Sequence, residues 1–162
     1  MGCPAAMAAP EGCDWCGAKL TGRARRWCST ACSTAYWENH GWNEAREAAK
    51  RRDGNRCVRC GHDPQEERQR REEFAHLLCL VCGPVPTWAP SAREAYWAFL
   101  RVSSLEVNHI NPILGRHAVV GCHHHLDGLE TLCHRCHVEE TARQFGHRRA
   151  SAPEPSLFEQ VA

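Results

Sequence analysis

Two stretches in the last third of the chain decide its fold: Leu105-Glu106-Val107-Asn108-His109-Ile110, and Leu129-Glu130-Thr131-Leu132-Cys133-His134-Arg135-Cys136-His137. The first stretch alternates between apolar and polar residues, and this period of two predicts a β-strand. Asn111-Pro112 ends the strand, because proline has no backbone N–H for the ladder. The second stretch leads into a helix from about Cys133 to Phe145, with Gly146 just past its end.

The C-x-x-C pair at the start of this helix places both sulfurs on one face and is half of a metal site. A C-x-x-C-G segment at Cys57–Gly61 supplies the other half, because a tight knuckle brings both sulfurs onto one tetrahedral ion at about 2.3 Å. The predicted structural zinc ligands are Cys57, Cys60, Cys133 and Cys136. This site ties the middle of the chain to its last helix and replaces part of a hydrophobic core.

A second C-x-x-C-G segment, Cys13–Gly17, lies near the N-terminus. A C-x-x-x-C pair follows it where another helix begins, and four thiolates again complete a tetrahedral site. The ligands predicted for this second structural zinc are Cys13, Cys16, Cys28 and Cys32.

The third C-x-x-C-G segment, Cys79–Gly83, has no matching cysteine pair. One interpretation is a third zinc bound by Cys79, Cys82 and Cys122 with one of three histidines, which are His117, His123 and His125. Another is a pair of buried thiols within an apolar stretch, because cysteine is commonly buried. A pairing of this segment with the helix cysteines, Cys133 and Cys136, is a further alternative.

Composition supports metal binding and excludes a membrane span. The chain has 162 residues with 12 Cys and 11 His. The longest apolar run, Leu77 to Cys82, is far shorter than the ~20 residues that cross a bilayer. Residues 1–12 lack the basic and apolar segments of a secretory signal, so we expect a reducing cytoplasm, where cysteine clusters bind metal. The preference for Arg over Lys favours a bacterial or phage source.

The formal net charge is only +1, so nucleic-acid binding must rest on local basic patches. Three such patches adjoin the cysteine pairs, around residues 19–26, 46–59 and 143–149. The alternative interpretation of each patch is a solvated surface. The residues predicted to contact DNA phosphates are Arg51, Arg52, Arg56, Thr141 and Arg143.

We therefore expect a small zinc-stabilised α+β protein. Its predicted segments are a flexible N-terminus at 1–11, a four-cysteine zinc knuckle at 12–36, a connecting helix at 37–54, a main domain at 55–146 with a helical insertion at about 62–103, and a disordered tail at 147–162. Helices are predicted over Trp42–Arg52, from an Asp63 cap toward Leu78, and from a capping box at Ser91–Glu94 to about Arg101. Ala118–Val120 is predicted as a short return strand.

The N-H-I of the first stretch, the L-C-x-x-C-H of the second and the upstream C-x-x-C-G together resemble the HNH endonucleases. The resemblance runs from Arg52-Asp53-Gly54-Asn55-Arg56-Cys57 to about Gln144, with an insertion between Gly61 and Ser104. The N-terminal quartet resembles a small zinc knuckle found before such domains. The resemblance implies a ββα-metal nuclease core within residues 55–146.

The resemblance also implies roles for individual residues. His109 matches the general base, and imidazole, which titrates near pH 6.5 in water, suits that task. His137 matches the metal ligand on the helix and directly follows a zinc ligand, Cys136. Asn108 stands at the position of a second metal ligand. The implied catalytic cation is Mg²⁺ or Mn²⁺.

Two departures from the family pattern concern this site. Asn108 replaces an aspartate, and a neutral amide is a weaker ligand for a hard cation, so Glu106 or Asp127 is expected to assist. Gly128 replaces the middle asparagine, whose role falls to Asp127 or to one of His123, His124 and His125. The alternative interpretation of these three histidines is a solvated loop. Asn108 and His109 can share one site only if the strand ends or bends there, because adjacent strand residues face opposite sides.

The function implied is a metal-dependent endonuclease that hydrolyses phosphodiester bonds of double-stranded DNA, leaving 5′-phosphate and 3′-hydroxyl ends. The alternative is a non-catalytic zinc-containing DNA-binding module with a decayed site, for which Asn108 and Gly128 are the evidence. A third hypothesis is a zinc-stapled adaptor that docks a partner through the helix around Glu66–Glu73. Expected partners are DNA and a phage packaging or other DNA-processing protein, with no membrane.

Overall fold

The computed structural model describes residues 3, 11–113 and 119–151. These ranges contain five α-helices and one two-stranded sheet, so the predicted α+β class is confirmed. The helices are α1 (Thr30–His40), α2 (Trp42–Arg52), α3 (Pro64–Cys82), α4 (Pro90–Leu100) and α5 (His134–Ser151). The strands are β1 (Glu106–His109) and β2 (Leu129–Leu132), and the short 3₁₀ turns are η2 (Val85–Thr87), η3 (Cys122–His124) and η4 (Leu126–Gly128).

The sheet is an antiparallel pair in which Asn108 lies opposite Glu130, and His109 opposite Leu129. β1 falls within the predicted strand, but its partner differs from the predicted return strand. Val120 forms only an isolated bridge, to Gly41, and residue 118 lies outside the described residues. β2 carries no apolar–polar alternation, because three of its four residues are buried.

A small core lies where α2 covers the sheet, and the helix has the predicted bounds. Ala45 and Ala49 of α2 pack against Val107 and Leu129, and their small side chains let the helix approach closely. A second cluster surrounds Leu132 and consists otherwise of thiols, with Leu105 at its edge. Within the described ranges, these two clusters form a modest core.

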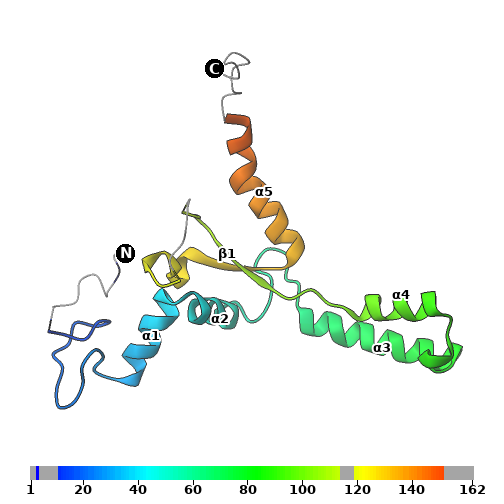
Figure 1. Ribbon diagram of the computed structural model, residues 1–162, viewed down its shortest axis with the longest axis horizontal. Coiled ribbons are helices and arrows are strands. Elements are labelled where there is room, and N and C mark those ends of the chain that lie inside the picture. Colours follow the sequence, from blue (N-terminus) through cyan, green and yellow to red (C-terminus); the bar gives the residue numbers. More distant parts are fainter. Residues whose placement is uncertain (1–2, 4–10, 114–118, 152–162) are drawn as a thin grey trace, which may run out of the picture.

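Helices α3 and α4 form an arm that extends away from the other elements (Figure 1) and coincides with the predicted insertion. Asp63 caps α3 as predicted, accepting hydrogen bonds from the N–H groups of Gln65 and Glu66. α3 continues beyond Leu78 to Cys82, and the capping Gly83 that follows has a φ of 79°. The predicted capping box of α4 is wrong, because this helix begins at Pro90 after an Ala89 cap.

The two terminal segments also differ from their predicted bounds. α1 crosses the predicted boundary at residues 36–37, and Gly41 separates it from α2. α5 continues through Gly146 to Ser151, because a single glycine costs a helix only about 1 kcal/mol. Residues 147–151 of the predicted tail are therefore helical; the rest of that tail, and residues 1–2 and 4–10, lie outside the described residues. Within the described ranges, none of the helices is both long enough and apolar enough to span a membrane.

Candidate functional site

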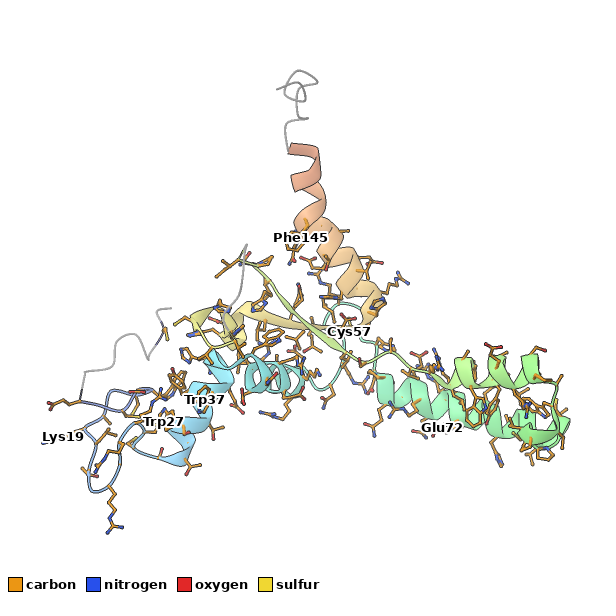
Figure 2. The ribbon with its side chains drawn as sticks, in the orientation of Figure 1. Lys19, Trp27, Trp37, Cys57, Glu72 and Phe145 are labelled. Carbon is orange, nitrogen blue, oxygen red and sulfur yellow. The ribbon has the colours of Figure 1, made fainter. Side chains whose placement is uncertain are left out.

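The predicted N-terminal quartet is assembled around a loop that leads into α1. The four ligand sulfurs lie within 4.8 Å of one another. Cys28 is central, with its Sγ 3.6 Å from that of Cys16 and 3.5 Å from that of Cys32. The Ser29 hydroxyl accepts the N–H of Cys32, so the cap that starts α1 also holds the backbone of one predicted zinc ligand. Figure 2 shows two tryptophans, Trp27 and Trp37, beside this module, with ring centroids 6.2 Å apart.

The second predicted quartet joins the Cys57 knuckle to the start of α5, with its ligand sulfurs also within 4.8 Å of one another. The Sγ atoms of Cys60 and Cys133 are 3.7 Å apart. The knuckle turns at Gly61, whose φ of 72° favours glycine, and Val58 donates its N–H to the carbonyl of Thr131 in β2. The site therefore fixes the knuckle, β2 and α5 relative to one another.

The electrostatics of both quartets favour a bound dication. Burial opposes ionisation of Cys13, but backbone N–H groups, including those of Cys16 and Cys28, lower its pKa to about 6. Neighbouring thiols, first that of Cys32, raise the pKa of Cys28 to about 12. Burial and neighbouring thiols likewise raise the pKa of Cys136. Four crowded sulfurs cannot all ionise without a cation, and Zn²⁺ supplies the charge that lets them do so.

The cysteines of the predicted third zinc are distributed differently. Cys122 lies with Cys3, His40 and His125 in a tetrad whose ligand atoms are within 4.8 Å of one another. Cys79 and Cys82 lie instead on the last turn of α3, where Cys79 is half-buried against Tyr96 and Cys82 is exposed. Of the predicted third grouping, the structure brings together Cys122 and His125 but not Cys79 and Cys82, and His117 lies outside the described residues. The alternative of two buried thiols is wrong, because Cys82 is exposed. Three tetrads in the described ranges can thus hold zinc.

One face of β1 presents Glu106 and Asn108 toward α5 and β2. The Oε1 of Glu106 is 2.8 Å from Nδ1 of His134, and its Oε2 is 2.8 Å from Nδ1 of His137. Asn108 is buried and donates its amide to Oε1 of Glu130, its cross-strand partner, at 3.1 Å. Carboxylate, amide and imidazole groups thus gather on this face, and these are ligand types for a divalent cation.

The opposite face of β1 presents His109 toward α2 and η3. Its ring stacks on that of Trp42, with centroids 5.0 Å apart and planes 16° apart. Its Nε2 is 3.2 Å from Nδ1 of His124, which is buried, and the ring of His123 lies 6.1 Å away. Two of the three consecutive histidines therefore surround the predicted base. His125 belongs to the third tetrad.

The face of β1 that carries Glu106 and Asn108, called the acidic face below, continues into an ion network around the buried Glu140. Arg59, from the Cys57 knuckle, contacts Glu130 at 3.0 Å and Glu140 of α5 at 2.6 Å. Glu140 is 1% exposed and also contacts Arg143. Hydrogen bonds from Arg143, and next those from Arg59, lower the pKa of Glu140 to about 2 despite its burial. This network ties α5 to both the knuckle and the strand that carries Glu130.

The arginines predicted to contact DNA all have carboxylate neighbours. Arg51 contacts Glu38 at 2.5 Å, Arg56 contacts Glu66 at 2.6 Å, and Arg143 contacts Glu140. Arg52 is held most firmly: it pairs with Asp53 and donates to the carbonyls of residues 126 and 129. Asp53 in turn accepts the N–H of Thr131.

Arg52 therefore fixes the turn before β2, whereas the side chains of Arg51, Arg56 and Arg143 are about half exposed or more. Thr141 is exposed on α5.

The remaining predicted positions lie in η4. Asp127 is exposed and lies close enough to Arg52 to raise the pKa of that guanidinium, although the paired Asp53 contributes more. The carbonyl of Gly128 accepts the N–H of Ile110 and extends the ladder past His109. A Cβ added at Gly128 would meet no heavy atom within 4 Å.

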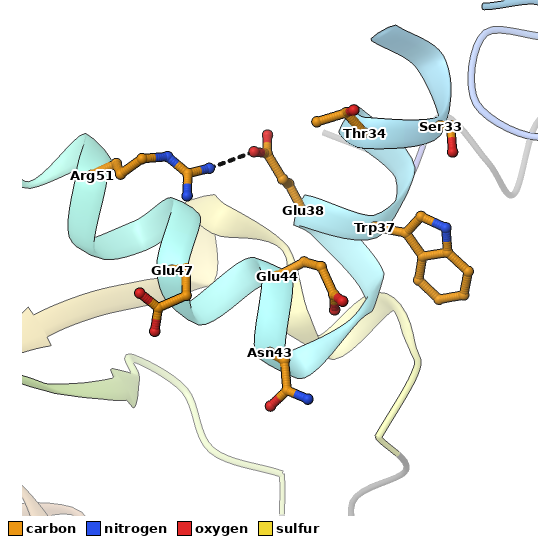
Figure 3. Close-up of a pocket in the computed structure, with 8 residues that line it drawn as sticks. All are labelled: Ser33, Thr34, Trp37, Glu38, Asn43, Glu44, Glu47 and Arg51. Carbon is orange, nitrogen blue, oxygen red and sulfur yellow. Dashed lines mark hydrogen bonds and ion pairs between the residues drawn. The ribbon is translucent and has the colours of Figure 1, made fainter. Parts of the chain in front are cut away.

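A separate groove of about 570 Å³ lies between α1 and α2 (Figure 3). Three glutamates, Glu38, Glu44 and Glu47, line it together with Trp37. Arg51 points across it to Glu38 (Figure 3). This carboxylate-rich lining repels phosphate, so the groove does not suit a nucleic-acid backbone.

Sequence reasoning missed His40 and Cys3 as members of the third tetrad, and it missed the ion network around Arg59 and Glu140. The C-x-x-H spacing from Cys122 to His125 was the available signal for the third tetrad. The network had no sequence signal, because its members come from three separate elements. Comparisons of the chain with protein-family models, curated proteins and solved structures gave no match.

Proposed function

We propose that the protein is a metal-dependent DNA endonuclease of the HNH type, with His109 as general base and His137 as a ligand of the catalytic cation. The observation that carries the proposal is that these two histidines stand in different environments. His137 faces a carboxylate, whereas His109 faces other imidazoles. The two histidines lie on opposite faces of β1, and each has the surroundings of its proposed role: a carboxylate that orients a metal ligand, and imidazoles beside a base.

The orientation of His137 suits a metal ligand. A carboxylate can only accept a hydrogen bond, so Nδ1 of His137 carries a proton toward Glu106 and leaves Nε2 as the ligand atom. Its backbone N–H bonds to the carbonyl of Cys133, so the zinc quartet holds the turn that carries it. Glu130 and Asn108, on the same face of the sheet, supply further oxygen ligands.

The donor set of this face therefore fits Mg²⁺ or Mn²⁺, with Mn²⁺ better suited to the imidazole. When bound, the cation would supply positive charge to the scissile phosphate and to the leaving oxygen.

His109 suits proton transfer. Stacking on Trp42 fixes its ring plane, and the 3.2 Å contact with His124 lets the two imidazoles share a proton. In the proposed reaction, His109 takes a proton from water as the water oxygen bonds to phosphorus. The bond from phosphorus to the 3′ oxygen breaks, and that oxygen takes a proton from solvent. The products are the 5′-phosphate and the 3′-hydroxyl.

The test is nicking of a supercoiled plasmid by the zinc-loaded protein, with and without added Mg²⁺ or Mn²⁺. Omission and re-addition of Mg²⁺ replaces EDTA, because EDTA would also strip the structural zinc. We expect Mg²⁺- or Mn²⁺-dependent nicking, and a loss of at least about 100-fold in His109→Ala. His76→Ala, an exposed histidine on the α3 arm, is the matched control and should nick normally.

Absence of nicking by the folded, zinc-loaded protein with either cation would reject the proposal. Plasmid binding without nicking would then favour the DNA-binding module.

A further inference from the structure

We infer that Cys3, His40, Cys122 and His125 form a third zinc site. This site joins Cys3 and the end of α1 to the loop that carries the three consecutive histidines, His123, His124 and His125. The site is distinct from both cysteine quartets. Its four ligand atoms lie within 4.8 Å of one another, although the residues come from three separate segments.

The distances within the tetrad are close to those expected for ligands of one tetrahedral zinc. Zn–N bonds of about 2.0–2.1 Å and Zn–S bonds of about 2.3 Å place two nitrogens about 3.3 Å apart, and a nitrogen and a sulfur about 3.6 Å apart. Nε2 of His40 is 3.4 Å from Nε2 of His125. It is 3.1 Å from Sγ of Cys3, so these two ligand atoms would move slightly apart around a bound zinc. The sulfur contacts within the cysteine quartets, at 3.5–3.7 Å, are similarly close.

The His40 ring is held in the orientation of a metal ligand. Its Nδ1 is 2.8 Å from the carbonyl of Tyr36. A carbonyl only accepts, so Nδ1 must donate and Nε2 carries the lone pair that faces the other ligands. The ring is 3% exposed and stacks on Tyr36 with centroids 4.4 Å apart. It contacts His125 edge-on at 4.9 Å. A buried imidazole with its second nitrogen fixed by a carbonyl is a preorganised ligand.

The backbone already brings the loop to the end of α1 (Figure 1). Gly121 donates its N–H to the carbonyl of His40 at 2.8 Å. Leu126 donates its N–H to the side chain of Asn39 at 3.3 Å. These bonds flank the two loop ligands, Cys122 and His125, so the zinc closes a turn that is anchored on both sides.

The third zinc site lies next to the histidines that contact the proposed base, His109. The same turn carries His123 and His124, and His124 contacts His109. Holding the residues on either side in a zinc site restricts the movement of His124 relative to His109. This consequence rests on the proposed function, whereas zinc binding by the tetrad does not.

Zinc stoichiometry tests the site directly. Native mass spectrometry of the full chain, purified under reducing conditions, should give three zinc ions per chain. Cys122→Ser and Cys3→Ser should each give two, and the two ions that remain report that the quartets are folded. Cys3→Ser is the milder variant, because Cys3 lies outside every helix and strand. Cys82→Ser, an exposed cysteine outside the tetrads, should keep three.

Two zinc ions in the unaltered chain, with the same number in Cys3→Ser, would overturn the inference. A Cys3–Cys122 disulfide under reducing conditions would overturn it as well. Nicking assays then test whether the third zinc site positions His124. We expect the nicking rate of Cys3→Ser to fall by about tenfold, which is within the range seen when a positioning contact is removed. The nicking rate of Cys82→Ser should be unchanged. Unchanged nicking in a two-zinc Cys3→Ser protein would overturn the positioning role alone. Failure of the unaltered protein to nick DNA would reject the proposed function, but the zinc stoichiometry would still decide whether the third zinc site exists.

Discussion

The two faces of β1 are neighbours in sequence but belong to different surroundings. Glu106 and Asn108 face α5, where carboxylates, arginines and His137 gather. Val107 and His109 face α2, where apolar side chains pack and imidazoles cluster. The alternation of a regular strand causes this division, and the ladder stays regular to Ile110. The strand neither ends nor bends between Asn108 and His109, so the condition for these two motif residues to share one site is not met. The comparison teaches that adjacent motif residues need not share one environment.

The largest expected effect separates the two histidines on the acidic face. His134 and His137 both contact Glu106 at 2.8 Å and both follow a quartet cysteine, but only the side chain of His137 is mostly buried, at 29% exposed. We expect His137→Ala to lower the Mg²⁺-dependent nicking rate by at least about 100-fold, because it removes a ligand of the catalytic cation. His134→Ala should lower it by less than about threefold, because this side chain is 66% exposed. Equal losses in the two variants would contradict the assignment of His137.

A carboxylate restored on the same face should have the next largest effect. Asn108→Asp replaces a neutral amide by a hard anionic ligand, so the Mg²⁺ concentration for half-maximal nicking should fall by about tenfold. Glu130 lies 3.1 Å from the amide, so without Mg²⁺ the two carboxylates should repel and lower the melting temperature. Asn108→Ala is the control that removes the amide without adding charge. A Mg²⁺ requirement that stays the same in Asn108→Asp would remove this position from the cation site.

What the sequence could predict depends on how the ligands are spaced along the chain. Each half of a cysteine quartet follows from local spacing, because a C-x-x-C or C-x-x-x-C segment brings its two sulfurs together whatever surrounds it. Two such halves predict each other as partners even when, as for Cys60 and Cys133, they are 73 positions apart. The third tetrad depends on His40 and His125, which are 85 positions apart and meet only after the chain has folded.

The strand β2 was missed for a related reason. Its residues are buried on both sides of the sheet and give no alternation for a pattern to detect. The glycine-based end predicted for α5 was wrong, because one glycine costs a helix only about 1 kcal/mol and the helix continues through it.

A smaller effect concerns the ion network behind the acidic face. Glu140→Gln should lower the free energy of unfolding by about 1 kcal/mol at pH 7, because Arg59 and Arg143 lose their shared carboxylate but remain partly solvated. Arginine hydrogen bonds lower the pKa of Glu140 to about 2 from an ordinary value of 4.5. The stabilisation is therefore complete above pH 4.5 and is lost as the pH falls toward 2.

Urea unfolding of both proteins between pH 8 and 3 measures this difference. It should stay constant down to about pH 5 and shrink below about pH 4.5. Zinc loss at low pH affects both proteins and cancels in the difference. Glu139→Gln, on the exposed side of α5, is the matched control. A difference that grows toward low pH would contradict the network.

The smallest expected effect concerns Gly128, at the end of the ladder between β1 and β2. Gly128 is the last residue of η4, and its carbonyl accepts the N–H of Ile110, the residue after His109. A side chain at this position would enter open space, so Gly128→Asn should fold normally. The new amide should raise the nicking rate by about threefold, the equivalent of one weak hydrogen bond that holds the loop beside His109. Gly128→Ala separates the effect of the amide from that of a stiffer backbone and should change the rate little. Equal gains in both variants would assign the effect to the backbone, and a loss in Gly128→Asn would show that glycine is needed beside the base.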